Sequence, residues 1–193
     1  MLSSALAADA LKIGVMLPLT GPQATFGRIQ QQSVQMAAAE VNAGGGINGK
    51  KIMPIEADTQ SNPDMGRRVI ERLIKRDKVL VIVGGFSSTV TWAAISIAQT
   101  NKIPFLVNSA AADKITEQGW EYIFRMNPPV SERLDTLASF VSTVTSVATD
   151  IRTVAIVHAS AFKEAASARR FFKKTGDLGL KAVIRESFGA GTT

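Results

Sequence analysis

The residues best suited to hold a ligand lie where an apolar run meets a helical one. The segment 84–89, with sequence GGFSST, follows the apolar run 79–83 and precedes a stretch with helical periodicity. The first N–H groups of a helix carry partial positive charge, and hydroxyl groups beside them add donors. Two glycines allow close approach to the backbone. This pattern favours binding of a carboxylate or phosphate, and the alternative is that the hydroxyls only cap the helix.

Other kinds of chemistry have weaker support in the sequence. The loop 44–50 resembles a phosphate-binding P-loop, but Lys51 replaces the magnesium-binding Ser or Thr, and the loop leads from a helix into a strand. His158 is the sole histidine and the chain has no cysteine, so we find no basis for nucleophilic catalysis. Capping or solvation explains Asp58 and Asp113, which lie near strand ends, better than acid–base catalysis does. We therefore expect no enzyme, no metal site and no cofactor.

The positive charge of the chain does not indicate a nucleic-acid partner. The 193 residues are 46% hydrophobic and 20% charged, with a net charge of +6, which is typical of a globular protein. Lys and Arg are spread over several expected helices and do not alternate with aromatic residues, as a surface that stacks bases would require. The apolar runs are far shorter than the roughly 20 residues that a membrane-spanning helix needs. We expect solvated basic helix faces and no nucleic acid.

Short apolar runs alternate with longer amphipathic stretches, which predicts an α/β fold with a parallel sheet flanked by helices. We expect strands at 11–17, 51–57, 79–83, 104–107, 122–125, 153–158 and 180–187, and helices at 26–41, 63–76, 90–99, 132–147 and 161–175. The fully apolar run 79–83 predicts a central strand. Ligands bind at the carboxyl ends of parallel strands, where the loops 20–27, 87–89 and 108–112 should converge.

Two features predict how the chain is divided. The motif ALA at 5–7 has the small-x-small pattern that signal peptidases recognise, so we interpret 1–8 as the remnant of a signal peptide. The sequence NPP at 127–129 stops regular structure and predicts a crossing between two lobes, 9–126 and 127–193. We expect the second lobe to be incomplete, because only two strands follow the crossing and so small a parallel sheet exposes its edges.

A series of short motifs spans nearly the whole chain. They are LKIGV at 11–15, TGP at 20–22, FG at 26–27, EVN at 40–42, GGING at 45–49, Asp58, VGG at 83–85, SST at 87–89, IP at 103–104, YIFR at 122–125 and VAIVH at 154–158. Together they resemble type I periplasmic binding proteins, above all the branched-chain amino-acid (Leu/Ile/Val)-binding family. That resemblance implies two Rossmann-like lobes that close on a ligand by a hinge. It also implies that roughly half of the usual sequence is missing here, because in such proteins the chain returns to both lobes.

The resemblance also implies which residues of the first lobe bind the ligand. Ser88 resembles the hydroxyl that holds the ligand carboxylate, with the backbone N–H of Thr89 beside it. Ser109, Ala110 and Ala111 resemble the loop whose backbone carbonyl and hydroxyl hold an α-ammonium group. Ala111 departs from the pattern, because amino-acid binders usually carry a threonine there. Loss of that hydroxyl weakens ammonium binding and leaves the carboxylate contacts intact.

Two aromatic residues resemble the walls of the ligand site. Phe26 matches a position that is often tyrosine in the family, so this side of the site is less polar. Phe162 resembles a wall residue of the second lobe, although the segment 158–165 is shorter than usual and lacks the customary glycine. The expected ligand is a branched-chain or aromatic amino acid, or an aromatic carboxylic acid.

The function that the resemblance implies is that of a periplasmic solute-binding component of an ABC importer. Such a protein delivers its small carboxylate ligand to a membrane permease and is expected to be a monomer at full length. A ligand-sensing regulator or receptor domain of the same fold, of the amide-sensor type, is the alternative, because one fold hosts many functions. The ALA motif favours export over a cytoplasmic sensor.

Overall fold

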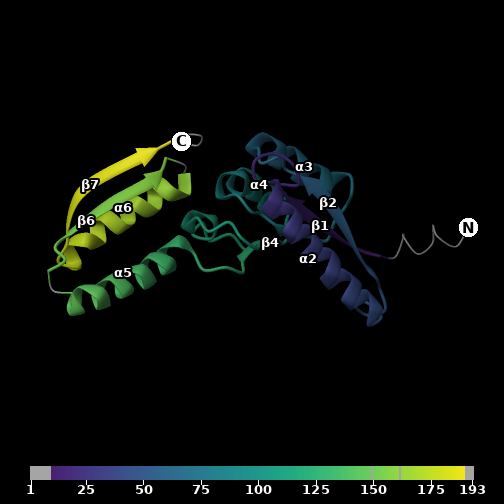
Figure 1. Cartoon of the computed structure of the whole chain (residues 1–193). Coiled ribbons are helices and arrows are strands. Elements are labelled where there is room, and N and C mark those ends of the chain that lie inside the picture. Colours follow the sequence, from purple (N-terminus) through teal and green to yellow (C-terminus); the bar gives the residue numbers. More distant parts are fainter. Residues whose placement is uncertain (1–9, 149, 161, 190–193) are drawn as a thin grey trace, which may run out of the picture. The chain divides into compact units, whose positions relative to one another are not determined.

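The computed structural model describes residues 10–148, 150–160 and 162–189, so the expected signal peptide remnant at 1–8 lies outside the described residues. The chain divides into two compact units (Figure 1). The first unit comprises the chain up to Ala110 together with Lys114–Asn127. The second comprises Ala111–Asp113 and the chain from Pro128 onward. Each unit has its own parallel sheet.

The first unit is built on a five-stranded parallel sheet with the order β2-β1-β3-β4-β5. The strands are β1 (Leu11–Leu17), β2 (Ile52–Asp58), β3 (Val81–Gly84), β4 (Phe105–Val107) and β5 (Ile123–Arg125). The middle strand is β3, as its apolar sequence predicts. The register places Val15 of β1 between Glu56 and Val83. The expected α/β class and the parallel sheet are therefore confirmed.

Helices cover both faces of this sheet: α2 (Ala24–Ala43), α3 (Pro63–Lys75) and α4 (Ser88–Thr100). Ile13 of β1 lines the same cavity as Val34 of α2. The next residue, Gly14, lies so close to α3 that an added Cβ would be 3.1 Å from the Cδ1 of Leu73. Because successive residues of a strand point to opposite faces, α2 and α3 lie on opposite sides of the sheet. No helix in the described part of the chain is long and apolar enough to cross a membrane.

The starts of α3 and α4 are set by different local features. The side chain of Asn62 accepts hydrogen bonds from the N–H groups of the first turn of α3, and Pro63 occupies the first helical position. Helix α4 begins at Ser88, two residues before the expected start, and Ser87 takes the N-cap position without a side-chain hydrogen bond to the helix. Simple capping by Ser87 is therefore not what the structure shows.

The core of the first unit is densely buried. Apolar residues that are at most 1% exposed lie along the sheet and on the helices that pack on it; they include Val15, Met16, Leu17, Ile70, Leu73, Ile82, Ile95, Phe105 and Val107. They come from β1, β3 and β4 and from α3 and α4. This core holds the carboxyl ends of β1, β3 and β4 in fixed positions.

The second unit has a two-stranded parallel sheet, β6 (Thr153–Ala159) and β7 (Lys181–Phe188), with the helices α5 (Val130–Val147) and α6 (Phe162–Asp177) (Figure 1). Its strand number is the one expected from the sequence. The apolar cluster consists of Ala111, Val130 and Leu134, with Phe171 packed against it. Strand β7 is exposed at every position except Ala182, which is half-buried. This unit therefore buries little apolar surface.

Candidate functional site

The turn that joins β3 to α4 requires glycine. Gly84 has φ of 126°, and a Cβ at this position would lie 2.2 Å from the carbonyl oxygen of Met16. The N–H of Gly85 donates to that same carbonyl at 3.0 Å. The close approach that the glycine doublet predicts is thus made by the backbone of β1. The consequence for the site is that α4 starts directly above the carboxyl end of the central strand.

The start of α4 presents hydrogen-bond donors. The first intrahelical bond runs from the N–H of Thr91 to the carbonyl of Ser87, 2.8 Å away. The N–H groups before Thr91 have no acceptor within the helix, as at every helix start, and they carry partial positive charge. Ser88 is the first residue of the helix and is only 7% exposed, whereas Thr89 is exposed. This geometry suits an anionic oxygen, which is the role predicted for Ser88 and Thr89.

The loop after β4 is fixed to this turn by backbone hydrogen bonds. The N–H of Asn108 donates to the carbonyl of Gly84 and the N–H of Ala110 donates to the carbonyl of Gly85, both at 2.8 Å. Ser109 lies between these two anchors. The structure therefore brings together two of the loops expected to converge, the start of α4 and the segment that follows β4.

A cluster of amide side chains surrounds Ser109. Nε2 of Gln30 donates to the Ser109 hydroxyl at 2.8 Å, and Nδ2 of Asn127 donates to the Ser109 carbonyl at 3.2 Å. Nδ2 of Asn108 donates to Oε1 of Gln30 at 3.2 Å. Oδ1 of Asn108 is buried and has no hydrogen-bond partner among the described residues. Sequence reasoning missed Gln30, because a run of glutamines on an amphipathic helix is typical of a solvated face.

Two stacked phenylalanines flank the start of α4. The rings of Phe26 and Phe86 have centroids 5.1 Å apart and planes within 16° of parallel. Phe26 lies in the first turn of α2 and is 56% exposed. A Cβ at Gly27 would lie 2.0 Å from the carbonyl oxygen of Pro18, so only glycine lets α2 start this close to the end of β1. The predicted wall residue Phe26 therefore stacks on Phe86, a residue for which no separate role was expected.

The remaining predicted site residues lie elsewhere. Ala111 belongs to the second unit, where its carbonyl accepts a hydrogen bond from the N–H of Val130 at 2.9 Å and its side chain is 2% exposed. Phe162 begins α6, but its side chain lies outside the described part of the chain. The first unit thus contains the other predicted residues, which are Phe26, Ser88, Thr89, Ser109 and Ala110.

Asp58 organises the loop that follows β1. Its carboxylate accepts hydrogen bonds from the N–H of Leu19 at 2.8 Å, from the N–H and hydroxyl of Thr20 at 3.1 and 2.6 Å, and from the N–H of Gln60 at 2.8 Å. Burial raises the pKa of Asp58, but these hydrogen bonds outweigh it and lower the pKa below its ordinary value. An ionised, fully bonded carboxylate is a structural group here and not a candidate general acid.

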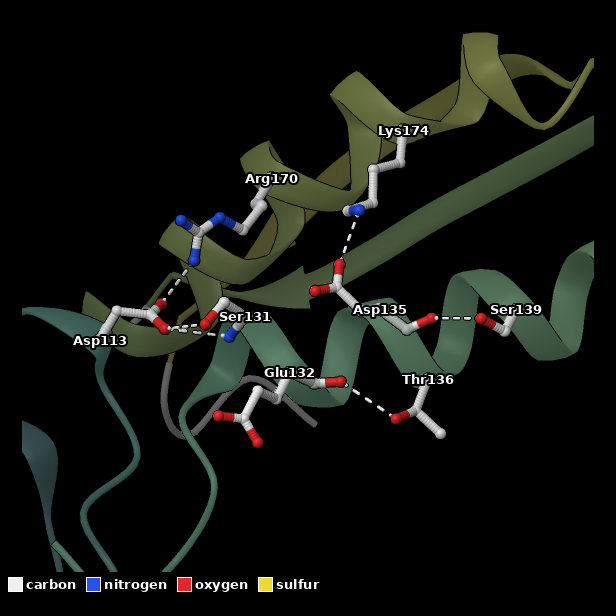
Figure 2. A network of polar contacts seen from close by, with 8 residues as sticks. All are labelled: Asp113, Ser131, Glu132, Asp135, Thr136, Ser139, Arg170 and Lys174. Atoms are coloured by element: carbon white, nitrogen blue, oxygen red, sulfur yellow. Dashed lines mark hydrogen bonds and ion pairs between the residues drawn. The ribbon is translucent and has the colours of Figure 1, made fainter.

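Asp113 ties together the parts of the second unit (Figure 2). Its Oδ1 accepts from the N–H of Ser131 at 3.0 Å and from the Ser131 hydroxyl, and Nη1 of Arg170 lies 2.8 Å from Oδ2. Ser131 is the second residue of α5, so Asp113 caps this helix from 18 residues upstream. The expected capping role of Asp113 is confirmed, and the carboxylates that could have supported catalysis are both engaged in structural contacts.

A cavity of about 520 Å³ lies along the face of the first sheet that α2 covers. Its walls are mainly apolar, with Val83 and Leu106 from the sheet and Val34 from α2, and Gln30 and Ser109 also line it. Of the predicted site residues only Ser109 lines it. The cavity therefore follows the sheet face and is distinct from the donors at the start of α4.

The sequence and the fold both match known proteins. The profile of the periplasmic binding protein family matches residues 10–193. A leucine-, isoleucine-, valine-, threonine- and alanine-binding protein of Pseudomonas aeruginosa is 28% identical over 195 aligned residues, which cover 98% of this chain and 49% of that protein. Another P. aeruginosa protein, named as an amino acid binding protein, is 36% identical over 114 residues. The chain spans about half the length of the relative that it matches from end to end.

Solved structures of binding proteins resemble the described fold. The substrate-binding protein of a branched-chain amino acid transporter from Streptococcus pneumoniae, in complex with isoleucine, is 28% identical with a TM-score of 0.79 over 95% of this chain and 51% of that one. A solute-binding protein of an ABC transporter from Rhodopseudomonas palustris, in complex with 3,4-dihydroxybenzoic acid, is 27% identical with a TM-score of 0.80 over 94% and 47%. Both neighbours are named as binding proteins of transporters.

Proposed function

Because the chain belongs to the periplasmic binding protein family, we propose that it is the solute-binding component of an ABC importer and that its ligand carries a carboxylate. The start of α4 carries this proposal. Its N–H donors and the buried Ser88 lie at the carboxyl end of the central strand, beside a loop fixed by hydrogen bonds. Isoleucine and 3,4-dihydroxybenzoic acid, the ligands of two structural neighbours, share a carboxylate and differ in almost everything else.

The wider biological role follows from the same proposal. We propose that the lobes are 9–126 and 127–193, which differ from the two units of the structure by Asn127 and by Ala111–Asp113. In this proposal the ligand is taken up in the periplasm and passed to a membrane permease. Phe26 and the loop 109–111 contribute to the ligand site, with Phe162 on the second lobe. No cofactor takes part, because binding and release need only a differential affinity between open and closed states.

Replacement of Ser88 tests the carboxylate site. In the protein as its source cell makes it, Ser88→Ala removes a buried hydrogen bond to a charged group, so its affinity for the ligand should fall by roughly 10- to 100-fold. Ser87→Ala, at the neighbouring N-cap without a side-chain bond to the helix, should change affinity by less than about threefold. Isothermal titration calorimetry with isoleucine and with 4-hydroxybenzoate measures both. Equal affinities of the two variants would remove Ser88 from the site.

A further inference from the structure

The amide of Gln30 determines which hydrogen-bonding group Ser109 offers to a ligand. We infer that Gln30 is a specificity-determining residue and that it selects a carboxylic acid without an α-ammonium group. This inference rests on the proposed function, and it narrows the ligand class of the same site. It departs from the expectation that the loop 109–111 holds an ammonium group.

An ammonium group needs several acceptors, because it carries three donors. The resemblance expects a backbone carbonyl and a hydroxyl of the loop 109–111 to serve it, and Ala111 lacks that hydroxyl. The hydroxyl and the carbonyl of Ser109 each already accept one hydrogen bond, from Gln30 at 2.8 Å and from Asn127 at 3.2 Å. Within the second unit, the Ala111 carbonyl likewise accepts from the N–H of Val130. The protein itself therefore uses one of the two acceptor positions of each of these oxygens, which leaves fewer for the three donors of an ammonium group.

The orientation of the Gln30 amide determines whether the Ser109 hydroxyl donates or accepts the hydrogen bond between them. Oε1 of Gln30 accepts from Nδ2 of Asn108, so its Nε2 faces Ser109 as a donor. A hydroxyl that accepts one hydrogen bond in this way still has its proton to give. The Ser109 proton is thereby directed away from Gln30, and a hydroxyl proton suits a carboxylate or a phenolic oxygen better than it suits an ammonium group.

The neutral amide oxygens near Ser109 are too weak to reverse this preference. Oδ1 of Asn108 is buried without a partner among the described residues, and Oδ1 of Asn127 is also buried. Both oxygens are neutral, and the removal of an ammonium group from water is costly unless the charge is paired and its three donors are satisfied. The stacked rings of Phe26 and Phe86 add flat apolar surface beside the start of α4. A planar aromatic carboxylate fits these groups.

The experiment compares two ligands that differ only in the ammonium group, phenylalanine and 3-phenylpropanoate, by calorimetry on the protein as its source cell makes it. The wild-type protein should bind 3-phenylpropanoate at least about tenfold more tightly. Gln30→Glu replaces the donor by a carboxylate that accepts the Ser109 proton and attracts a cation, so the affinity ratio should shift by at least about tenfold toward phenylalanine. Gln32→Glu, exposed on the same helix, adds the same charge and should leave the ratio within about twofold.

The outcomes separate this inference from the proposed function. If the wild-type protein binds phenylalanine as tightly as 3-phenylpropanoate or more tightly, the inference is overturned and the solute-binding function stands. An equal shift in Gln30→Glu and Gln32→Glu would also overturn it, because the effect would then be one of net charge. If neither ligand binds, nor isoleucine nor 4-hydroxybenzoate, the proposed function itself fails. The wild-type ratio requires no variant, so poor folding of Gln30→Glu leaves the test decisive.

Discussion

The two units of the chain differ in how completely they bury their apolar residues. In the first unit, Ile82 of the central strand is fully buried between neighbouring strands and helices. In the second, Ile156 of β6 is the strand residue with the lowest exposure, at 8%, and it lines a cavity of about 530 Å³. A sheet of two strands seldom forms a stable domain by itself, whereas five strands with helices on both faces readily do.

This difference fits the place of the proposed binding groups. The donors of α4 and the loop 108–110 are attached to β1, β3 and β4 by backbone hydrogen bonds, and these strands lie in the dense core. Binding groups need support from rigid elements if they are to meet a ligand with fixed geometry. The first unit provides that support. The second unit relies instead on polar contacts such as those of Asp113.

The largest expected effect is a difference in the free energy of unfolding between the two units when one isoleucine of each is replaced by alanine. Ile82→Ala leaves a cavity in a closed core and should lower the free energy of unfolding by about 3 kcal/mol. Ile156→Ala, at the wall of an existing cavity, should cost about 1 kcal/mol or less. Both tryptophans, Trp92 and Trp120, belong to the first unit, so urea unfolding followed by tryptophan fluorescence reports on that unit.

Fluorescence and hydrogen exchange together show whether the two units differ in how well their cores are packed. We expect Ile82→Ala to shift the fluorescence transition and Ile156→Ala to leave it nearly unchanged while exchange in β6 and β7 becomes faster. Equal shifts of the fluorescence transition in the two variants would mean that the units unfold as one cooperative body with comparable cores.

A smaller effect is expected from the polar network of the second unit (Figure 2). Asp113→Ala removes the cap of α5 and the ion pair with Arg170, and should destabilise this unit by about 2 kcal/mol. Asp135→Ala is the matched control. Its ion pair with Lys174 is 2.6 Å long, but the Asp135 side chain is 62% exposed, so its loss should cost less than about 1 kcal/mol.

Amide hydrogen exchange in α5 measures this contrast. Asp113→Ala should accelerate exchange in the first turn of α5, and Asp135→Ala should leave it close to the wild-type rate. If the two variants behave alike, the network is a set of surface contacts and the second unit is held together in another way.

Much of the fold could be predicted because each element follows from local sequence. The period of the apolar residues placed the strands and helices within a few residues, and the crossovers of a parallel sheet then follow. The start of α4 was expected at residue 90, but the helix begins at Ser88. The hydroxyl run suggested a cap before the helix, whereas Ser88 lies inside its first turn.

The site was only partly predictable, because its polar contacts join residues far apart in the sequence. Gln30 and Ser109 are separated by 79 residues, and nothing in the run of glutamines distinguishes the one that contacts the loop after β4. Phe86 likewise gains its partner only when α2 is positioned against β1. Asp113 was expected to cap or to be solvated, and its distance of 18 residues from Ser131 hides the helix that it caps.

We propose that the protein is a periplasmic receptor for a small carboxylic acid, and native mass spectrometry of the protein from the periplasmic fraction of its source cell tests this proposal most directly. We expect one bound small molecule per chain whose fragments identify a carboxylic acid without an amine. Recovery of the protein only from the cytoplasmic fraction, with no carboxylate bound, would contradict it.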